Sequence, residues 1–473
     1  MKNEAIFNNH PENKPEALHY GAAMENACKL CSPLGACMVF KGIENCVPLI
    51  HGGQGCATYI RRYLISHFRE PVDIASSNFS EESTIFGGSK IFNLSIDNIQ
   101  KVYHPEIIGI CSTCLSETIG ENIPMLINNY RRISQSQNTI LVSASTPSYA
   151  GTHAEGFHEA VFAVVKALAD NNAEFHGINL FPGMLSPADL RHLKEILCDF
   201  KLNSIMLPDY SETFDNPVWK TYKRIPEGGT PVNNIRKTGS SGASIEFGTM
   251  LNKGWGLTKT NKSVVQSAGE YLEKYFHVPN VQIPIPIGIS LTDAFFNQLK
   301  QISSGEIPGK YSKSRGRLID SYIDAHKIVF EKRAIVYGEE DLVVSMVAFL
   351  SEVGIRTVLA SSGADGYNLK TEIEKVTDNT SGLTISGNTG FEHIRKAAGE
   401  LKPDIIIGNS RGYYISRELD IPFVRIGFPI HDRIGSQRIM HIGYQGTQQL
   451  FDRIANALLE HKQDKSPVGY KYM

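Results

Sequence analysis

Three cysteines in the first quarter of the chain each stand beside glycine or proline. Cys31 opens the segment CSPLGA, Cys56 closes HGGQGC, and Cys114 lies in CSTCLSE. Thiolates are soft ligands that suit iron–sulfur clusters, and small neighbours let a large inorganic group approach the backbone. Packing of a helix or strand does not require the three glycines of HGGQGC, whereas close contact between the backbone and a ligand does. These cysteines therefore predict a metal centre through which electrons pass.

The cysteine spacing leaves two alternatives open. Cys28 and Cys31 form one C-x-x-C pair, and Cys111 and Cys114 form another, as in structural zinc sites. The two pairs lie much farther apart than the about 15 to 20 residues of a zinc ribbon. The second pair follows a predicted strand, as a thioredoxin-type redox motif does, but lacks the usual aromatic and Gly-Pro neighbours.

The remaining cysteines have other surroundings. Cys37, Cys46 and Cys198 have apolar neighbours, which predicts small, buried side chains. The roles of Cys28 and Cys111 stay open. Three thiolates do not complete a four-iron or eight-iron cluster, so the missing ligands are expected from a partner chain, with the cluster at a subunit interface.

Length and composition restrict the class of protein. The 473 residues, of which 41% are hydrophobic and 20% charged, predict a globular protein of two to four domains. The net charge of −2, without a long Lys/Arg run, argues against a nucleic-acid partner. A polar N-terminus and the lack of an apolar run of about 18 residues predict no membrane span and a cytoplasmic location.

The elements that must position the cysteines alternate between strands and helices. Eight short runs rich in Ile and Val are apolar on both faces, as buried parallel strands are. They are residues 106–110, 139–143, 177–181, 204–207, 333–337, 356–360, 404–408 and 422–426. Helices are expected over 158–170 and 188–200, the second with Ser186 as its cap. The fold class is therefore α/β, with doubly wound units whose strand ends bind ligands.

Polar stretches rich in Gly, Pro and Ser suggest where the chain divides into domains. We expect an extended N-terminal arm over residues 1–27, a cluster-binding α/β domain over 28–170, a second α/β domain over 171–325, and a third with a C-terminal tail over 326–473. The polar stretch 216–240 is predicted to be a long crossover, and 302–315 to be a linker.

Six further short blocks lie along the chain beyond the cysteine loops. They are HFREP at 67–71, FGG at 86–88, TCLSETIG at 113–120, TPSY at 146–149, IGNS at 407–410 and GFPIHDR at 427–433. With CSPLGA and HGGQGC they resemble the β-type chains of nitrogenase component 1, from about residue 28 to about residue 460. The resemblance implies three Rossmann-like domains with parallel sheets and a heterotetramer of two α-type and two β-type chains.

The resemblance also implies site residues. Cys31, Cys56 and Cys114 fall on the β-chain cysteines of a P-cluster, of eight irons or as a smaller [4Fe–4S] form, and Ser148 falls on a serine that adds an oxygen ligand. Phe86 matches an aromatic residue that faces the ATP-dependent iron protein. From the residues alone, Ser148 is equally a turn or helix cap, and Phe86 equally a buried turn anchor.

Four histidines in the matched blocks are expected to be structural, namely His51, His67, His153 and His431. GNSRG at 408–412 lacks the Gly-Lys-Ser/Thr ending of a P-loop, so no nucleotide site is expected on this chain. No residue is predicted to be catalytic.

Within the family, the resemblance fits two kinds of subunit. The catalytic β subunit NifK pairs with NifD, which holds the iron–molybdenum cofactor, and relays electrons from the iron protein NifH to reduce dinitrogen to ammonia. NifN pairs with NifE to form the scaffold on which that cofactor is matured. The blocks CKLC, ATYIRR, PVDIASS and GTHAEGF favour NifN of anaerobes, whereas the full set of three cysteines favours NifK. We expect NifN, with NifK as the alternative; a nitrogenase-like reductase acting on another substrate is a third.

Overall fold

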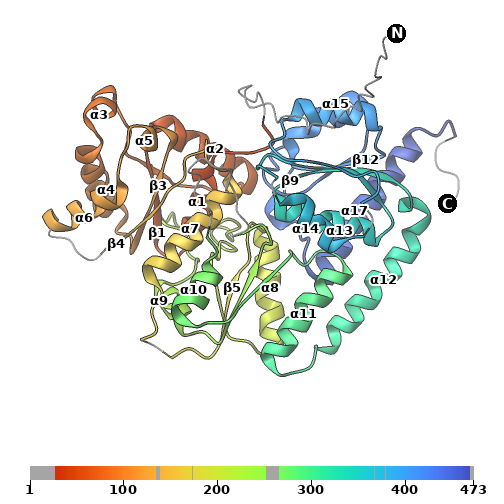
Figure 1. Ribbon diagram of the computed structural model, residues 1–473, viewed down its shortest axis with the longest axis horizontal. Helices are drawn as coiled ribbons and strands as arrows, with labels where there is room; N and C mark the ends of the chain where they lie inside the picture. The colour runs from red at the N-terminus through yellow and green to blue at the C-terminus, as the bar shows by residue number, and fades with distance from the viewer. Residues whose placement is uncertain are drawn as a thin grey trace, which may run out of the picture.

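The computed structural model describes residues 27–134, 139–172, 174–251, 266–366, 368–378 and 380–468. The predicted N-terminal arm lies outside these ranges except for its last residue. Three parallel sheets form three lobes, each covered by helices (Figure 1). The predicted α/β fold with parallel sheets is therefore confirmed. Within the described residues, no helix is long and apolar enough to cross a membrane.

The first sheet has the strand order β2-β1-β3-β4. Its strands are β1 (Cys46–His51), β2 (Ala75–Ser76), β3 (Ile107–Ser112) and β4 (Ile140–Ala144). The helices of this lobe are α1 (Ser32–Lys41), α2 (Gln54–Phe68), α3 (Glu81–Phe86), α4 (Ser89–Tyr103), α5 (Cys114–Thr118), α6 (Ile123–Ile133) and α7 (His153–Leu168).

The second sheet has the order β6-β5-β7-β8, and the third has the order β11-β10-β9-β12-β13. The second lobe contains β5 (Ile178–Phe181), α8 (Pro187–Asp199), β6 (Ser204–Met206), α9 (Val232–Arg236), η1 (Lys237–Ser240), β7 (Ala243–Phe247), α10 (Ala268–Phe276), β8 (Asn280–Ile283) and α11 (Ile289–Ser303). Helix α12 (Gly309–Val329) leads to the third lobe and packs against its last helix. The third contains β9 (Arg333–Gly338), α13 (Glu340–Glu352), β10 (Arg356–Ser362), α14 (Leu369–Val376), β11 (Thr384–Ser386), α15 (Phe391–Leu401), β12 (Ile405–Gly408), α16 (Tyr413–Leu419), β13 (Phe423–Arg425) and α17 (Gly443–Asp464).

All eight predicted strands are present, as β3, β4, β5, β6, β9, β10, β12 and β13. The sequence missed the other five strands described, β1, β2, β7, β8 and β11. Of these, β1 is central, and its Pro48 argues against a central strand. The structure tolerates this proline because the short β2 pairs only with Leu49 and Ile50, so β2 does not reach Pro48. Helix α7 begins earlier than predicted, at His153, because Thr152 and Glu155 form a capping box in front of it.

The predicted linker over 302–315 is wrong. Helix α11 continues to Ser303 and α12 begins at Gly309, which leaves only residues 304–308 as a loop. The proposed boundary near 325 falls inside α12, so the domain limits stay a prediction. The stretch 216–240 does connect two strands, β6 and β7, and its last part forms α9 and η1.

Helices α1 and α7 pack backbone against backbone. A Cβ atom at Gly35 would stand 1.8 Å from the carbonyl oxygen of His153, and one at Gly156 would stand 2.0 Å from that of Ser32. An antiparallel bridge between Cys31 and Thr152 extends this contact. Every residue of α1 is buried. The start of α1 is therefore held against the segment that follows β4.

Replacing Gly35→Ala is expected to lower the free energy of unfolding by about 1–3 kcal/mol, because the added methyl group overpacks a backbone contact. Gly316→Ala is the matched control. It lies within α12, where a Cβ meets nothing within 4 Å, and it should raise stability by up to about 1 kcal/mol. Chemical denaturation of both variants checks this, and equal effects would contradict the close α1–α7 packing.

Candidate cluster-binding site

The three predicted cluster cysteines all lie at the beginning of a helix. Cys31 is the N-cap of α1, Cys56 lies in the first turn of α2, and Cys114 is the first residue of α5. Unpaired N–H groups and the positive end of the helix dipole favour a thiolate at such positions. Cys56 and Cys114 are exposed, and Cys31 is half-buried.

The first sheet places two of these cysteines at one edge. Strands β1 and β3 pair in parallel over their full lengths, from Cys46 opposite Ile107 to His51 opposite Ser112. The loops toward Cys56 and Cys114 therefore leave the sheet side by side. Strand β4 pairs with β3, and the segment that carries Ser148 leaves from the same edge. This edge is where open α/β sheets bind ligands.

A direct contact joins the loop before Cys56 to the loop before Cys114. The hydroxyl of Thr113 donates to the carbonyl oxygen of His51 at 3.1 Å, and it also accepts from the N–H of Ser116, which caps α5. A Cβ at Gly52 would lie 2.2 Å from the Thr113 hydroxyl oxygen. Position 52 therefore requires glycine if the two loops are to stay together.

Ser148 links the segments of the other two cysteines. Its backbone N–H donates to Cys114 Sγ at 3.2 Å, and its Oγ accepts from the backbone N–H of Ser32 at 3.1 Å. Because Ser32 is the first residue of α1, this bond from a distant segment satisfies one of the free N–H groups at the start of that helix. Ser148 itself lies in a turn, where the N–H of Ala150 donates to the carbonyl oxygen of Pro147 at 3.0 Å, and it does not cap α7, the helix that follows. The turn interpretation is therefore confirmed. Its role as a ligand stays a prediction.

The thiols lie close enough to influence each other electrostatically. Burial raises the pKa of Cys56, and the charges of Cys31 and Cys114 raise that pKa further. Three adjacent thiolates repel one another, whereas a bound cationic centre removes their protons and relieves the repulsion. The donor set therefore fits a metal cluster.

The space around the thiols fits a large group. A Cβ at Gly53 or Gly55 would meet nothing within 4 Å, so the start of α2 is open. Within the described ranges, no three Cys, His, Asp or Glu side chains converge as ligands of a single metal ion would. The ligands of a multi-iron cluster bind different iron atoms and need not converge on one point.

The zinc alternative is wrong for the described chain. Cys111 is buried, with its Sγ 4.0 Å from that of Cys37, while Cys28 is buried in a separate apolar cluster with residues of the third sheet. The two C-x-x-C pairs therefore do not face a common ion. Cys37 and Cys46 are buried as predicted, but Cys198 is exposed, because it lies outside the buried face of α8.

Phe86 lies at the end of α3 with 83% of its surface exposed, beside Ile85 at 74%. The buried-anchor interpretation of Phe86 is therefore wrong. Two adjacent exposed apolar side chains on a capped helix form what we call the α3 tip. Its role in docking stays a prediction.

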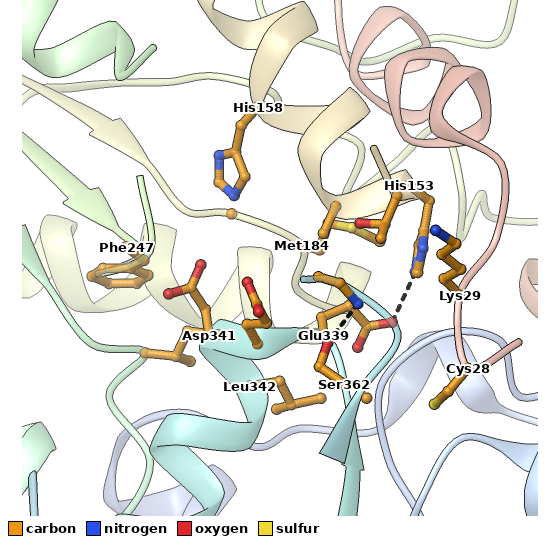
Figure 2. A pocket seen from close by; sticks show the side chains of 17 residues that line it. Cys28, Lys29, His153, His158, Met184, Phe247, Glu339, Asp341, Leu342 and Ser362 are labelled. Atoms are coloured by element: carbon orange, nitrogen blue, oxygen red, sulfur yellow. Dashed lines mark hydrogen bonds and ion pairs between the residues drawn. The ribbon is translucent and has the colours of Figure 1, made fainter. Parts of the chain in front are cut away.

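The histidines of the matched blocks differ in their contacts. His67 accepts at Nδ1 from the N–H of Ile430, at 2.7 Å. His153 contacts Glu339 at 2.9 Å and accepts from the N–H of Leu30 at 3.3 Å. Figure 2 shows the His153–Glu339 pair on the wall of a cavity of about 30 Å³ between the lobes. Both histidines are structural, as predicted. His51 is buried, and neither ring nitrogen has a hydrogen-bond partner among the described residues.

Ser148→Ala is expected to cost about 1 kcal/mol of unfolding free energy, because it removes the cap on Ser32. The N–H bond to Cys114 is a backbone bond and should persist. Ser145→Ala, which removes only an exposed bond to Glu117, is the control and should stay within about 0.5 kcal/mol of the parent. Denaturant titration measures both, and an unchanged Ser148→Ala protein would contradict the cap.

Comparisons with known proteins agree with this geometry. Residues 31–459 match the family described as Nitrogenase component 1 type Oxidoreductase. The nitrogenase molybdenum-iron protein beta chain of Clostridium pasteurianum is 33% identical over 439 residues, which cover 92% of this chain and 93% of that protein. The nitrogenase vanadium-iron protein beta chain of Trichormus variabilis is 31% identical, with 94% and 96% covered.

A solved structure, Nitrogenase Cp1 at pH 6.5, superposes with a TM-score of 0.90 at 32% sequence identity, covering 97% of this chain and 98% of that one. The match extends through all three lobes and includes the segments that hold the three cysteines. The chain therefore belongs to the nitrogenase component 1 family, as one of its β-type chains.

Proposed function

We propose that this chain supplies Cys31, Cys56 and Cys114 to an iron–sulfur cluster that it shares with an α-type partner in an α2β2 complex. The observation that carries this proposal is the grouping of three thiols at helix starts, two of them exposed. A P-type cluster of eight irons, or a [4Fe–4S] cluster, needs more ligands than three thiolates, so the partner completes the set. When bound, the cluster supplies one-electron chemistry.

The chain's own residues hold and tune this group. The N–H of Ser148 donates to Cys114 Sγ, and such bonds stabilise a thiolate and raise the potential of the cluster it binds. The Ser148 hydroxyl lies between the Cys31 and Cys114 segments, where an oxygen ligand is able to join the cluster. Among the proposed partners, the ATP-dependent iron protein, NifH, docks at the α3 tip through Phe86.

Within the family, we propose the scaffold subunit, NifN, which pairs with NifE and supports maturation of the iron–molybdenum cofactor in the partner chain. Support comes from the blocks CKLC, ATYIRR, PVDIASS and GTHAEGF. The second candidate is NifK, which pairs with NifD in the reduction of dinitrogen. The complete cysteine set favours NifK, and the relatives described above are named as beta chains of the nitrogenase molybdenum-iron and vanadium-iron proteins.

Anaerobic co-purification with the α-type partner, followed by acetylene reduction with iron protein, ATP and dithionite, separates the two candidates. A scaffold is expected to be brown and loaded with iron, to turn over little acetylene, and to activate cofactor-deficient component 1 in an extract. Turnover at a nitrogenase-like rate would instead make this chain the catalytic β subunit.

Cys56→Ala and Cys114→Ala are each expected to remove most of the iron of the shared cluster, while iron held by the partner chain remains, because a lost thiolate opens the cluster to solvent and exchange. Cys198→Ala is the matched control, since Cys198 is also exposed but lies on α8. It should retain the iron of the parent. Iron content and the visible spectrum measure the effect, and a colourless parent complex would overturn the cluster proposal.

A further inference from the structure

One carboxylate connects the α3 tip with both exposed cysteine loops. Oε1 of Glu121 accepts from the backbone N–H of Gly88 at 2.5 Å, directly after the tip. Glu121 itself belongs to the segment that begins at Cys114, because its N–H donates to the carbonyl oxygen of Ser116 at 2.9 Å. The sequence offered no sign of this role, since Glu121 follows the matched block TCLSETIG as an ordinary polar residue.

The second oxygen of Glu121 faces an unsatisfied group. Oε2 lies 3.6 Å from Nε2 of His51, which is longer than a hydrogen bond. The ring of His51 is fully buried and is fixed by edge contacts with Phe79 and Phe92, at 4.8 and 5.1 Å between ring centroids. Burial lowers the pKa of His51, and Glu121 acts in the opposite direction. A charge-assisted hydrogen bond between them would need about 2.8 Å.

The rings of Phe79 and Phe92 pack against the imidazole on its edges, so closing the gap requires the Glu121 carboxylate to move. A shift of less than about 1 Å closes the gap. A Cβ at Gly88 would lie 2.8 Å from the Phe79 ring and 3.2 Å from that of His51, so the backbone after the tip lies directly against both rings. Gly88 follows Phe86 after a single residue, so the chain leads from the tip directly to the N–H that the carboxylate accepts from.

We propose that Glu121 is a positioning residue that couples protein docking at the α3 tip to the loops of Cys56 and Cys114, by closing onto His51 when Gly88 moves. His51 then donates from Nε2 to Oε2. The carbonyl oxygen of His51 holds the Thr113 hydroxyl that caps α5, so the change reaches Cys114 as well as the loop toward Cys56. This inference rests on the proposed function, in which the iron protein is the docking partner and the thiols bind a cluster.

The test uses the co-purified complex with its α-type partner and measures the midpoint potential of the cluster with and without the iron protein. Docking is expected to shift the potential of the parent. Glu121→Gln keeps an acceptor for Gly88 but loses the charge, and it should lose more than half of this shift while its affinity for the iron protein changes less than twofold. Glu121→Asp, which keeps the charge, should restore part of the shift.

Glu117→Gln is the matched control. It removes a carboxylate four residues earlier, on α5, where that group accepts from the Ser145 hydroxyl instead, and it should behave as the parent does. A full shift in Glu121→Gln would overturn the inference, as would a loss of iron-protein affinity of tenfold or more, which would make Glu121 a docking contact.

Hydrogen exchange of residues 51–56 and 87–90 separates failure of this inference from failure of the proposed function. If the parent complex carries no cluster, the proposed function fails, yet docking should still slow exchange in both segments, and Glu121→Gln should lose the effect at 51–56 only. Absence of any change at 51–56 on docking, or no binding of the iron protein at all, would overturn the coupling.

Discussion

The parallel pairing of β1 with β3 is the constraint on which the rest of the site depends. Six residues of each strand are paired in register, so both strands end side by side and the loops that follow them begin next to each other. A slip of one residue between them would turn the side chains of the slipped strand to the opposite face of the sheet. The contact between Gly52 and Thr113 then fixes the distance between the two loops, because no side chain fits there. The strand pairing and the contact between these loops together determine the positions of Cys56 and Cys114.

The position of Cys31, the third cysteine, depends on helix packing and not on the strands. Cys31 precedes the sheet in sequence, and it reaches the same edge because α1 and α7 meet through Gly35 and Gly156. Ser148 completes the arrangement by bonding to the segments of Cys31 and Cys114 at once. Rigid backbone contacts of this kind suit the proposed site, for which a partner chain supplies the remaining ligands. The three cysteines must keep their positions before that partner binds.

Family membership and the local chemistry of the thiols both support a cluster at Cys31, Cys56 and Cys114. Belonging to the nitrogenase component 1 family makes a cluster at the three thiols a natural expectation, and their mutual effect on the pKa of Cys56 gives that expectation a physical basis in this chain. The α3 tip lies apart from the thiols in sequence but is joined to them through Glu121 and His51. The imidazole of His51 faces Glu121 at 3.6 Å, but neither ring nitrogen has a hydrogen-bond partner among the described residues, and leaving a buried polar group without a hydrogen bond costs stability.

The sequence by itself determined the α/β class, eight of the strands, the start of α8, and the residue types able to bind a cluster. These follow from local patterns: apolar runs, caps, and soft ligands beside glycine. It could not determine β1, because Pro48 is acceptable only where the neighbouring strand is short, nor the exposure of Phe86 and Cys198. Only the tertiary structure decided two contacts, the bond of Ser148 to the start of α1 and the approach of Glu121 to His51. Each joins segments far apart in the chain, and local sequence patterns do not predict contacts of this kind.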